Sequence, residues 1–126
     1  MCMPRDELYL TEIVEAIDRI SRWLNGIDTD RWNDDDMLRA AVLQQLTTIG
    51  EASRSINDQL QERHSDVPWR RIADFRNVAV HEYFAIEWSL VWRLVRDRLP
   101  ILRPQIMKVI GTEFPGIAAR LDQNQR

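Results

Sequence analysis

The chain has 126 residues and a mass of 14.9 kDa, a length that predicts a single domain. Hydrophobic residues make up 44% and charged residues 29%, values typical of a globular protein and not of a wholly disordered chain. The sequence holds no apolar run of ~18 residues, as a membrane span would need, and its start does not resemble a signal peptide. The lone cysteine, Cys2, cannot form an intrachain disulfide. We therefore expect a cytoplasmic protein with no membrane contact.

Charge is distributed unevenly along the chain. Residues 1–62 contain 13 acidic residues and 6 arginines, whereas residues 63–126 contain 7 acidic residues, 10 arginines and 1 lysine. Either the acidic and basic helices pair with one another, or the basic half binds a nucleic acid or nucleotide. Arginine suits the second interpretation, because its guanidinium forms bidentate contacts with phosphate.

Helical periodicity begins in the first segment of the chain. Apolar residues at helical spacing predict a helix over residues 10–24, which Asn25-Gly26 ends. Aspartates within residues 28–36 are N-cap candidates, and a cation site built from them is a weaker alternative. A long second helix is expected from Met37 to about His64.

The middle of the chain is the least regular part. Pro68 is typical of a first helical turn, with Ser65 or Asp66 as its cap. Residues 78–84 alternate loosely and resemble a strand. Because no other segment has a period of two that could pair with it, we interpret residues 78–84 as helix.

The last helical pattern runs over residues 86–111, where Pro100 and Pro104 should kink or split the helix. Residues 112–126 are polar and are expected to form a flexible tail. The predicted fold is all-α, an up-and-down four-helix bundle with a kinked last helix. We assign residues 1–111 to this domain.

A polar cluster follows the predicted first turn after Pro68. On a helix, Asn77 and His81 are four residues apart, and Arg76 and Tyr83, seven apart, lie nearly one above the other. The cluster fits a subunit interface or a ligand groove. An Arg–Glu pair with a histidine near a helix end is the structural alternative.

Val80 and Phe84 interrupt this polar face and would otherwise be exposed to water. They predict a homodimer. No metal site is expected, because His64 and His81 are too few and too far apart in the sequence.

Several short motifs resemble the HepT family, the HEPN-domain half of the HepT/MntA toxin–antitoxin systems. The resemblance covers residues 8 to 110, and its motif Arg-x4-His-x-Tyr is matched in full. The motifs are Leu38-Arg39-Ala40-Ala41-Val42, Ile49-Gly50-Glu51-Ala52, Val67-Pro68-Trp69-Arg70, Arg76-Asn77, Val80-His81-Glu82-Tyr83-Phe84, Val91-Trp92 and Leu99-Pro100.

The resemblance implies a homodimeric, HEPN-like bundle and a metal-independent endoribonuclease that needs no cofactor. Arg76 and His81 would be its catalytic residues, since histidine transfers protons near neutral pH and arginine stabilises a phosphate in the transition state. Asn77 is a candidate to orient the imidazole or a phosphate. Glu51 is a candidate partner of Arg70 or Arg76, although an ordinary interhelical ion pair explains it equally well.

The resemblance further implies a partner, the nucleotidyltransferase antitoxin MntA, which would attach AMP to Tyr83 and silence the toxin. The alternative function is a non-catalytic HEPN module that binds a nucleotidyltransferase or a nucleotide. Trp69, Trp88 and Trp92 could stack on RNA bases, but helix-face aromatics more often pack in a core.

Overall fold

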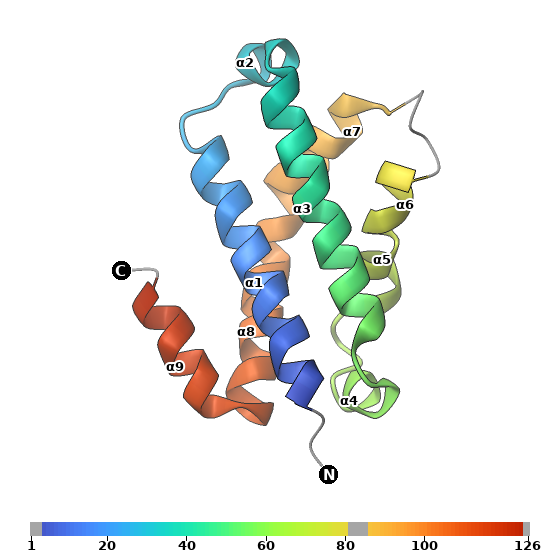
Figure 1. Cartoon of the computed structure of the whole chain (residues 1–126), viewed down its shortest axis with the longest axis vertical. Coiled ribbons are helices and arrows are strands. Elements are labelled where there is room, and N and C mark those ends of the chain that lie inside the picture. The colour runs from blue at the N-terminus through green and yellow to red at the C-terminus, as the bar shows by residue number, and fades with distance from the viewer. Residues whose placement is uncertain (1–3, 81–85, 125–126) are drawn as a thin grey trace.

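Helices make up the whole of the regular structure over the described residues, which are 4–80 and 86–124 of a computed structural model (Figure 1). In chain order they are α1 (Pro4–Leu24), α2 (Thr29–Asp34), α3 (Asp36–Ser55), α4 (Asp58–Arg63), α5 (Trp69–Ala73), α6 (Phe75–Val80), α7 (Trp88–Arg93), the π segment (Leu94–Arg98), α8 (Leu99–Glu113) and α9 (Pro115–Asn124). The predicted all-α class is confirmed.

The core lies between the three long helices. Helix α1 packs against α3 and α8, and the other side of α3 packs against α5 and α6. Where the expected bundle would have a fourth long helix, the structure has the two short helices α5 and α6. The largest side chains enclosed between these helices include Leu10, Ile13, Ile17, Leu46, Ile49, Ile106 and Ile110. None of the described helices is long and apolar enough to cross a membrane.

The acidic connection between α1 and α3 consists of helix caps. After the turn at Gly26, whose φ is +77°, Asp28 accepts a hydrogen bond from the Arg31 amide and caps α2. Asp35 accepts one from the Leu38 amide and caps α3 in the same way. The capping interpretation of this segment is confirmed.

The expected helix from Met37 to His64 is interrupted. Ile56 is extended, with ψ at 140°, and Asn57 starts α4 by accepting a hydrogen bond from the Gln59 amide. The Asn57 amide itself donates to the Asp6 carboxylate of α1, over 3.1 Å. Because Asp6 is buried, this contact across the fold stabilises the break.

Helix α5 begins at Trp69, with Pro68 at the N-cap position and no side-chain cap, so the expected caps Ser65 and Asp66 are wrong. The entry into α5 is held by Trp69, whose Nε1 donates to the His64 carbonyl over 3.0 Å. Trp69 is also buried, and its packing replaces the missing cap.

The last long helix is continuous but contains a π-helical stretch. The π segment separates α7 from α8, and the Leu99 amide donates to the Leu94 carbonyl, five residues back. Pro100 follows directly and has no amide proton, so the regular α-helical bond cannot form there. The predicted kink region therefore appears as a π turn.

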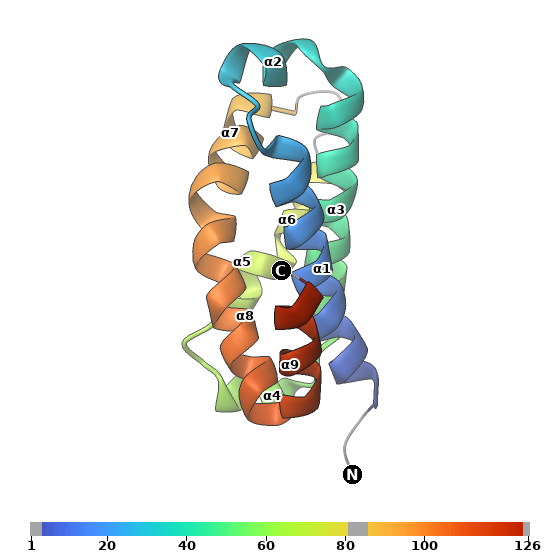
Figure 2. The ribbon, with the colours of Figure 1, turned by 90° about the vertical axis from the view of Figure 1, so that its left-hand side faces the viewer.

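Residues 115–124, expected to belong to a flexible tail, instead form helix α9, which packs along α8 (Figure 2). Pro115 occupies its first turn, where a missing amide costs nothing. Ile117 and Leu121 are four residues apart and face the core, and Leu121 is buried. One apolar stripe is enough to hold this polar helix.

The end of α8 is tied to the end of α4 by Glu113. Its carboxylate accepts a hydrogen bond from Arg63 over 2.6 Å and lies 3.1 Å from His64 Nε2. The bond from Arg63 and then the bond from His64 lower the pKa of Glu113, against the opposing effect of its burial. The folded state therefore favours the charged carboxylate.

We predict that Glu113→Gln lowers the melting temperature at pH 7. The loss should be about 1 kcal/mol, or about 4 °C, for a partly exposed charged hydrogen bond. Because the pKa is depressed by folding, the stabilisation is present above the ordinary value of 4.5 and is lost as pH falls through the lowered value.

Thermal melts of wild type and variant from pH 3 to 7 test this, and the two curves should converge at the acid end. Glu62→Gln removes an exposed carboxylate on α4 for which the structure shows no ion pair, and it should leave the melting temperature unchanged. A deficit in Glu113→Gln that does not vary with pH would contradict the assignment.

Candidate functional site

A close approach of two backbones places α6. A Cβ added at Gly50 of α3 would lie 2.7 Å from the Arg76 amide nitrogen and 3.0 Å from the Ala73 carbonyl oxygen. Real Cβ atoms do not come this close to backbone, so a side chain at position 50 would displace α6. Glycine at position 50 therefore sets the position of Arg76 relative to α3.

The turn of α3 that makes room for α6 also supplies a negative charge to it. Glu51 Oε1 lies 3.6 Å from Arg76 Nε, within ion-pair range but too far for a hydrogen bond. The Nε atom is buried and has no hydrogen-bond partner in the described structure. The Glu51 side chain is 61% exposed, so the pair is weak and leaves the guanidinium able to bind an anion.

Glu51 thus pairs with Arg76, and among the described contacts it has none with Arg70. Arg70 lies on α5 and is exposed. It lines a hollow next to Asp58 and Glu62 of α4. The structure therefore brings Glu51 and Arg76 together and leaves Arg70 apart from them.

Asn77 is exposed and is bound to Asp74, the residue directly before α6. Its Nδ2 donates to Asp74 Oδ1 over 3.3 Å, and its amide donates to the Asp74 carbonyl over 2.9 Å. These bonds fix the first turn of α6.

The second half of the motif, from His81 onward, lies outside the described residues. His81, Tyr83 and Phe84 lie outside the described residues, and so does the side chain of Val80. Helix α6 is described up to Val80, directly before His81.

The other histidine, His64, has a structural environment. Its ring is 12% exposed and contacts Glu113, at the end of the molecule where α4 lies and away from α6 (Figure 1). Its carbonyl accepts the Trp69 indole bond described above. The described residues contain no group of three or more histidine, cysteine or acidic side chains placed to hold a metal ion.

The three tryptophans considered as stacking platforms pack within the protein. Trp69 is buried, and Trp88 and Trp92 contact the fully buried Trp32 at ring-centroid distances of 6.2 and 5.1 Å. The Trp32 indole donates to the Trp88 carbonyl. Sequence reasoning missed Trp32, whose only signal was a large apolar residue in a short acidic helix.

The comparisons of this chain with a family model and with known proteins point to the same family. The family model described as ribonuclease HepT-like matches residues 13–109. A candidate RNase of Methanocaldococcus jannaschii is 33% identical over 78% of this chain and 90% of its own length. Probable ribonuclease HepT of Thermococcus cleftensis is 32% identical over 80% of this chain and 92% of its own.

A third relative, a candidate RNase of Caldanaerobacter subterraneus subsp. tengcongensis, is 30% identical over 83% of this chain and 94% of its own. No solved structure matches the chain. The family model spans most of the chain, from the middle of α1 almost to the end of α8, and includes the contact between Gly50 and Arg76. This chain belongs to the HepT-like ribonuclease family.

Proposed function

We propose that the protein is the toxin of a HepT/MntA-type system, a metal-independent endoribonuclease that cleaves RNA at Arg76 and His81. The observation that carries the proposal is the placement of Arg76. Its backbone is fixed against Gly50, while among the described residues its guanidinium has a loose contact with Glu51 alone. Such a cation is held in position and is still able to bind a phosphate.

RNA supplies its own nucleophile, so few protein groups are needed. The 2′-oxygen attacks the phosphorus as a base takes its proton, and the 5′-oxygen leaves with a proton from an acid. The products are a 2′,3′-cyclic phosphate and a free 5′-hydroxyl. His81 would transfer these protons, and Arg76 would stabilise the negative charge that builds on the phosphate oxygens.

A single histidine serves as base or as acid in one step, not as both. We propose that the protein acts as a homodimer whose two-fold axis brings two copies of the Arg76/His81 site to one cleft. Each RNA bond would then be cleaved between a basic and an acidic imidazole from different chains.

We predict that His81→Ala lowers the rate of RNA cleavage about 10²-fold or more, the usual scale for losing an acid–base group. The rate of the wild type should be unchanged by EDTA. His64→Ala is the matched control, because His64 contacts Glu113 far from α6, and it should retain the cleavage rate. Cleavage of a fluorescent RNA of mixed sequence measures the rates of His81→Ala, of His64→Ala and of the wild type with EDTA.

Light scattering on the same samples should give twice the chain mass. A monomer that cleaves RNA at the normal rate would contradict the two-chain site. Equal losses in His64→Ala and His81→Ala would remove the assignment of His81. An intact wild type with no cleavage of any RNA would favour the alternative, a non-catalytic module that binds a nucleotidyltransferase or a nucleotide.

We predict that Gly50→Ala lowers cleavage about 10-fold or more while the chain stays helical, because the new Cβ must push α6 and Arg76 away from α3. Gly111→Ala is the matched control, since its Cβ would meet nothing within 4 Å. Circular dichroism and the cleavage rate separate the effects. Full activity in Gly50→Ala would show that the position of α6 does not matter.

We propose that an MntA-type nucleotidyltransferase regulates the enzyme by attaching AMP to Tyr83. The phosphodiester-linked AMP would add negative charge and bulk to the segment that carries His81, and it would compete with RNA for Arg76. Asn77, close to Arg76 in α6, would help to position the RNA phosphate or the imidazole.

We predict that Tyr83→Phe remains an active ribonuclease but is no longer silenced by MntA and ATP. The wild type should gain the mass of one or more AMP units on Tyr83 and lose cleavage. Mass spectrometry and the RNA assay measure both effects. AMP found on Tyr9, the chain's other tyrosine, would overturn the regulatory proposal.

A further inference from the structure

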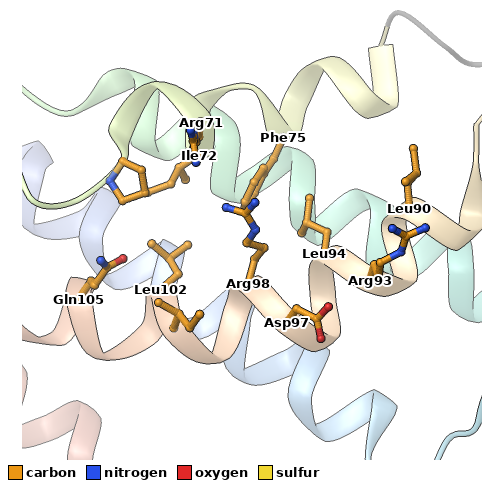
Figure 3. A pocket seen from close by; sticks show the side chains of 12 residues that line it. Arg71, Ile72, Phe75, Leu90, Arg93, Leu94, Asp97, Arg98, Leu102 and Gln105 are labelled. Atoms are coloured by element: carbon orange, nitrogen blue, oxygen red, sulfur yellow. The ribbon is translucent and has the colours of Figure 1, made fainter.

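A groove of about 710 Å³ lies beside α6, between α5–α6 and the long helix that runs from α7 through the π segment into α8 (Figure 3). Its floor is apolar and includes Ile72, Phe75 and Leu102. Leu90 and Ile101 extend this surface and are 51% and 61% exposed. The groove therefore leaves apolar side chains exposed to solvent.

Three arginines surround this floor. Arg71 comes from α5, Arg93 from the end of α7 and Arg98 from the π segment, and all three are exposed. Figure 3 shows Arg98 extending from its helix across the groove toward Phe75. Asp97 is the single acidic residue among those that line the groove, so its walls carry an excess of positive charge.

The arginines of the groove differ from the arginines of the scaffold. Arg103 pairs with Asp18 at 2.8 Å and Arg63 with Glu113 at 2.6 Å. For Arg71, Arg93 and Arg98 the described structure shows no ion pair and no hydrogen bond from the guanidinium. Within the described part of the chain, no carboxylate pairs with these three charges.

The π segment turns one row of side chains toward the groove over about three turns. Leu90, Leu94, Arg98 and Leu102 are spaced four apart, and a second row starts at Arg93. In a straight α-helix the first and last of these residues would differ by about 120°. A π turn takes up about one extra residue and removes about 100° of that drift.

The groove also adjoins the candidate site. Phe75 lines it, and the next residue along α6 is Arg76. A polymer bound at Arg76 could therefore continue over Phe75 into the groove.

We propose that this groove binds a single-stranded segment of the RNA substrate next to the cleaved bond. Arg71, Arg93 and Arg98 contact its phosphates, and a base packs on the apolar floor at Phe75. The inference rests on the proposed ribonuclease function and adds the place where the strand is held. Aromatic floors and arginine walls are how proteins bind unpaired RNA.

The charge and size of the groove favour RNA over other occupants. A second copy joined across this groove by a two-fold axis would place one excess of positive charge against another. Its volume lies in the ~300–1,000 Å³ range of pockets that enclose drug-sized ligands, which suits a short unpaired stretch and not a duplex.

The test measures RNA binding in the His81→Ala background, where the RNA should stay intact. Arg71→Gln with Arg98→Gln should weaken binding of a labelled 12-nucleotide single strand about 10-fold or more. The slope of log affinity against log salt should fall by about 1.4, since each lost phosphate contact removes about 0.7.

The matched control is Arg22→Gln with Arg120→Gln, which removes the same charge from exposed positions on α1 and α9. It should bind as tightly as the parent. Circular dichroism checks that each variant is folded.

A second measurement does not depend on substitutions. RNA carrying 4-thiouridine should crosslink on irradiation to the tryptic peptide of residues 72–76, which contains Phe75. If the wild type cleaves RNA, but Arg71→Gln with Arg98→Gln leaves the RNA affinity unchanged in the His81→Ala background and the cleavage rate unchanged in the wild-type background, the groove proposal is overturned and the ribonuclease stands. Loss of the dimer or of antitoxin binding in that variant, with normal RNA affinity, also overturns it. No cleavage by the wild type means that the ribonuclease proposal itself has failed.

Discussion

The contact between Gly50 and Arg76 is the constraint on which the candidate site depends. The two backbones are so close at Gly50 that a Cβ there would clash with the backbone at Ala73 and Arg76, so α6 cannot keep this position with a larger residue at position 50. Helix α3 is held on its other side by α1, so the position of Arg76 is fixed by the core itself. Glu51 adds charge next to this contact, but an exposed pair at 3.6 Å cannot position a helix.

Some arginines of this chain contact a carboxylate closely in the described structure, and others do not. Those in the scaffold have short contacts with carboxylates, as in the pair of Arg103 and Asp18 that joins α8 to α1. Those around the groove and at Arg76 have weak partners or none in the described structure. Internal pairing across the two halves of the chain therefore explains part of the uneven charge, as in the pair of Arg103 and Asp18.

Much of the fold could be predicted from local patterns, because helical periodicity and aspartate caps act within a few residues. Where the predictions failed, the cause lay in tertiary contacts or in packing that helical periodicity does not show. The break at Ile56 depends on Asp6, and the entry to α5 depends on the buried Trp69. Helix α9 was missed because a polar segment needs only Leu121 and its neighbours to dock on α8.

The candidate site shows the same division between local and distant information. The spacing of Arg76 and His81 is readable in the sequence, but the choice of Glu51's partner and the need for glycine at position 50 are not. The sequence singles out His81 by its motif, and the structure adds the surroundings of His64. His64 is held by Glu113 and supports Trp69, so its ring links α4 to α8. In the proposed mechanism, proton transfer would fall to His81, the other of the two histidines in the chain.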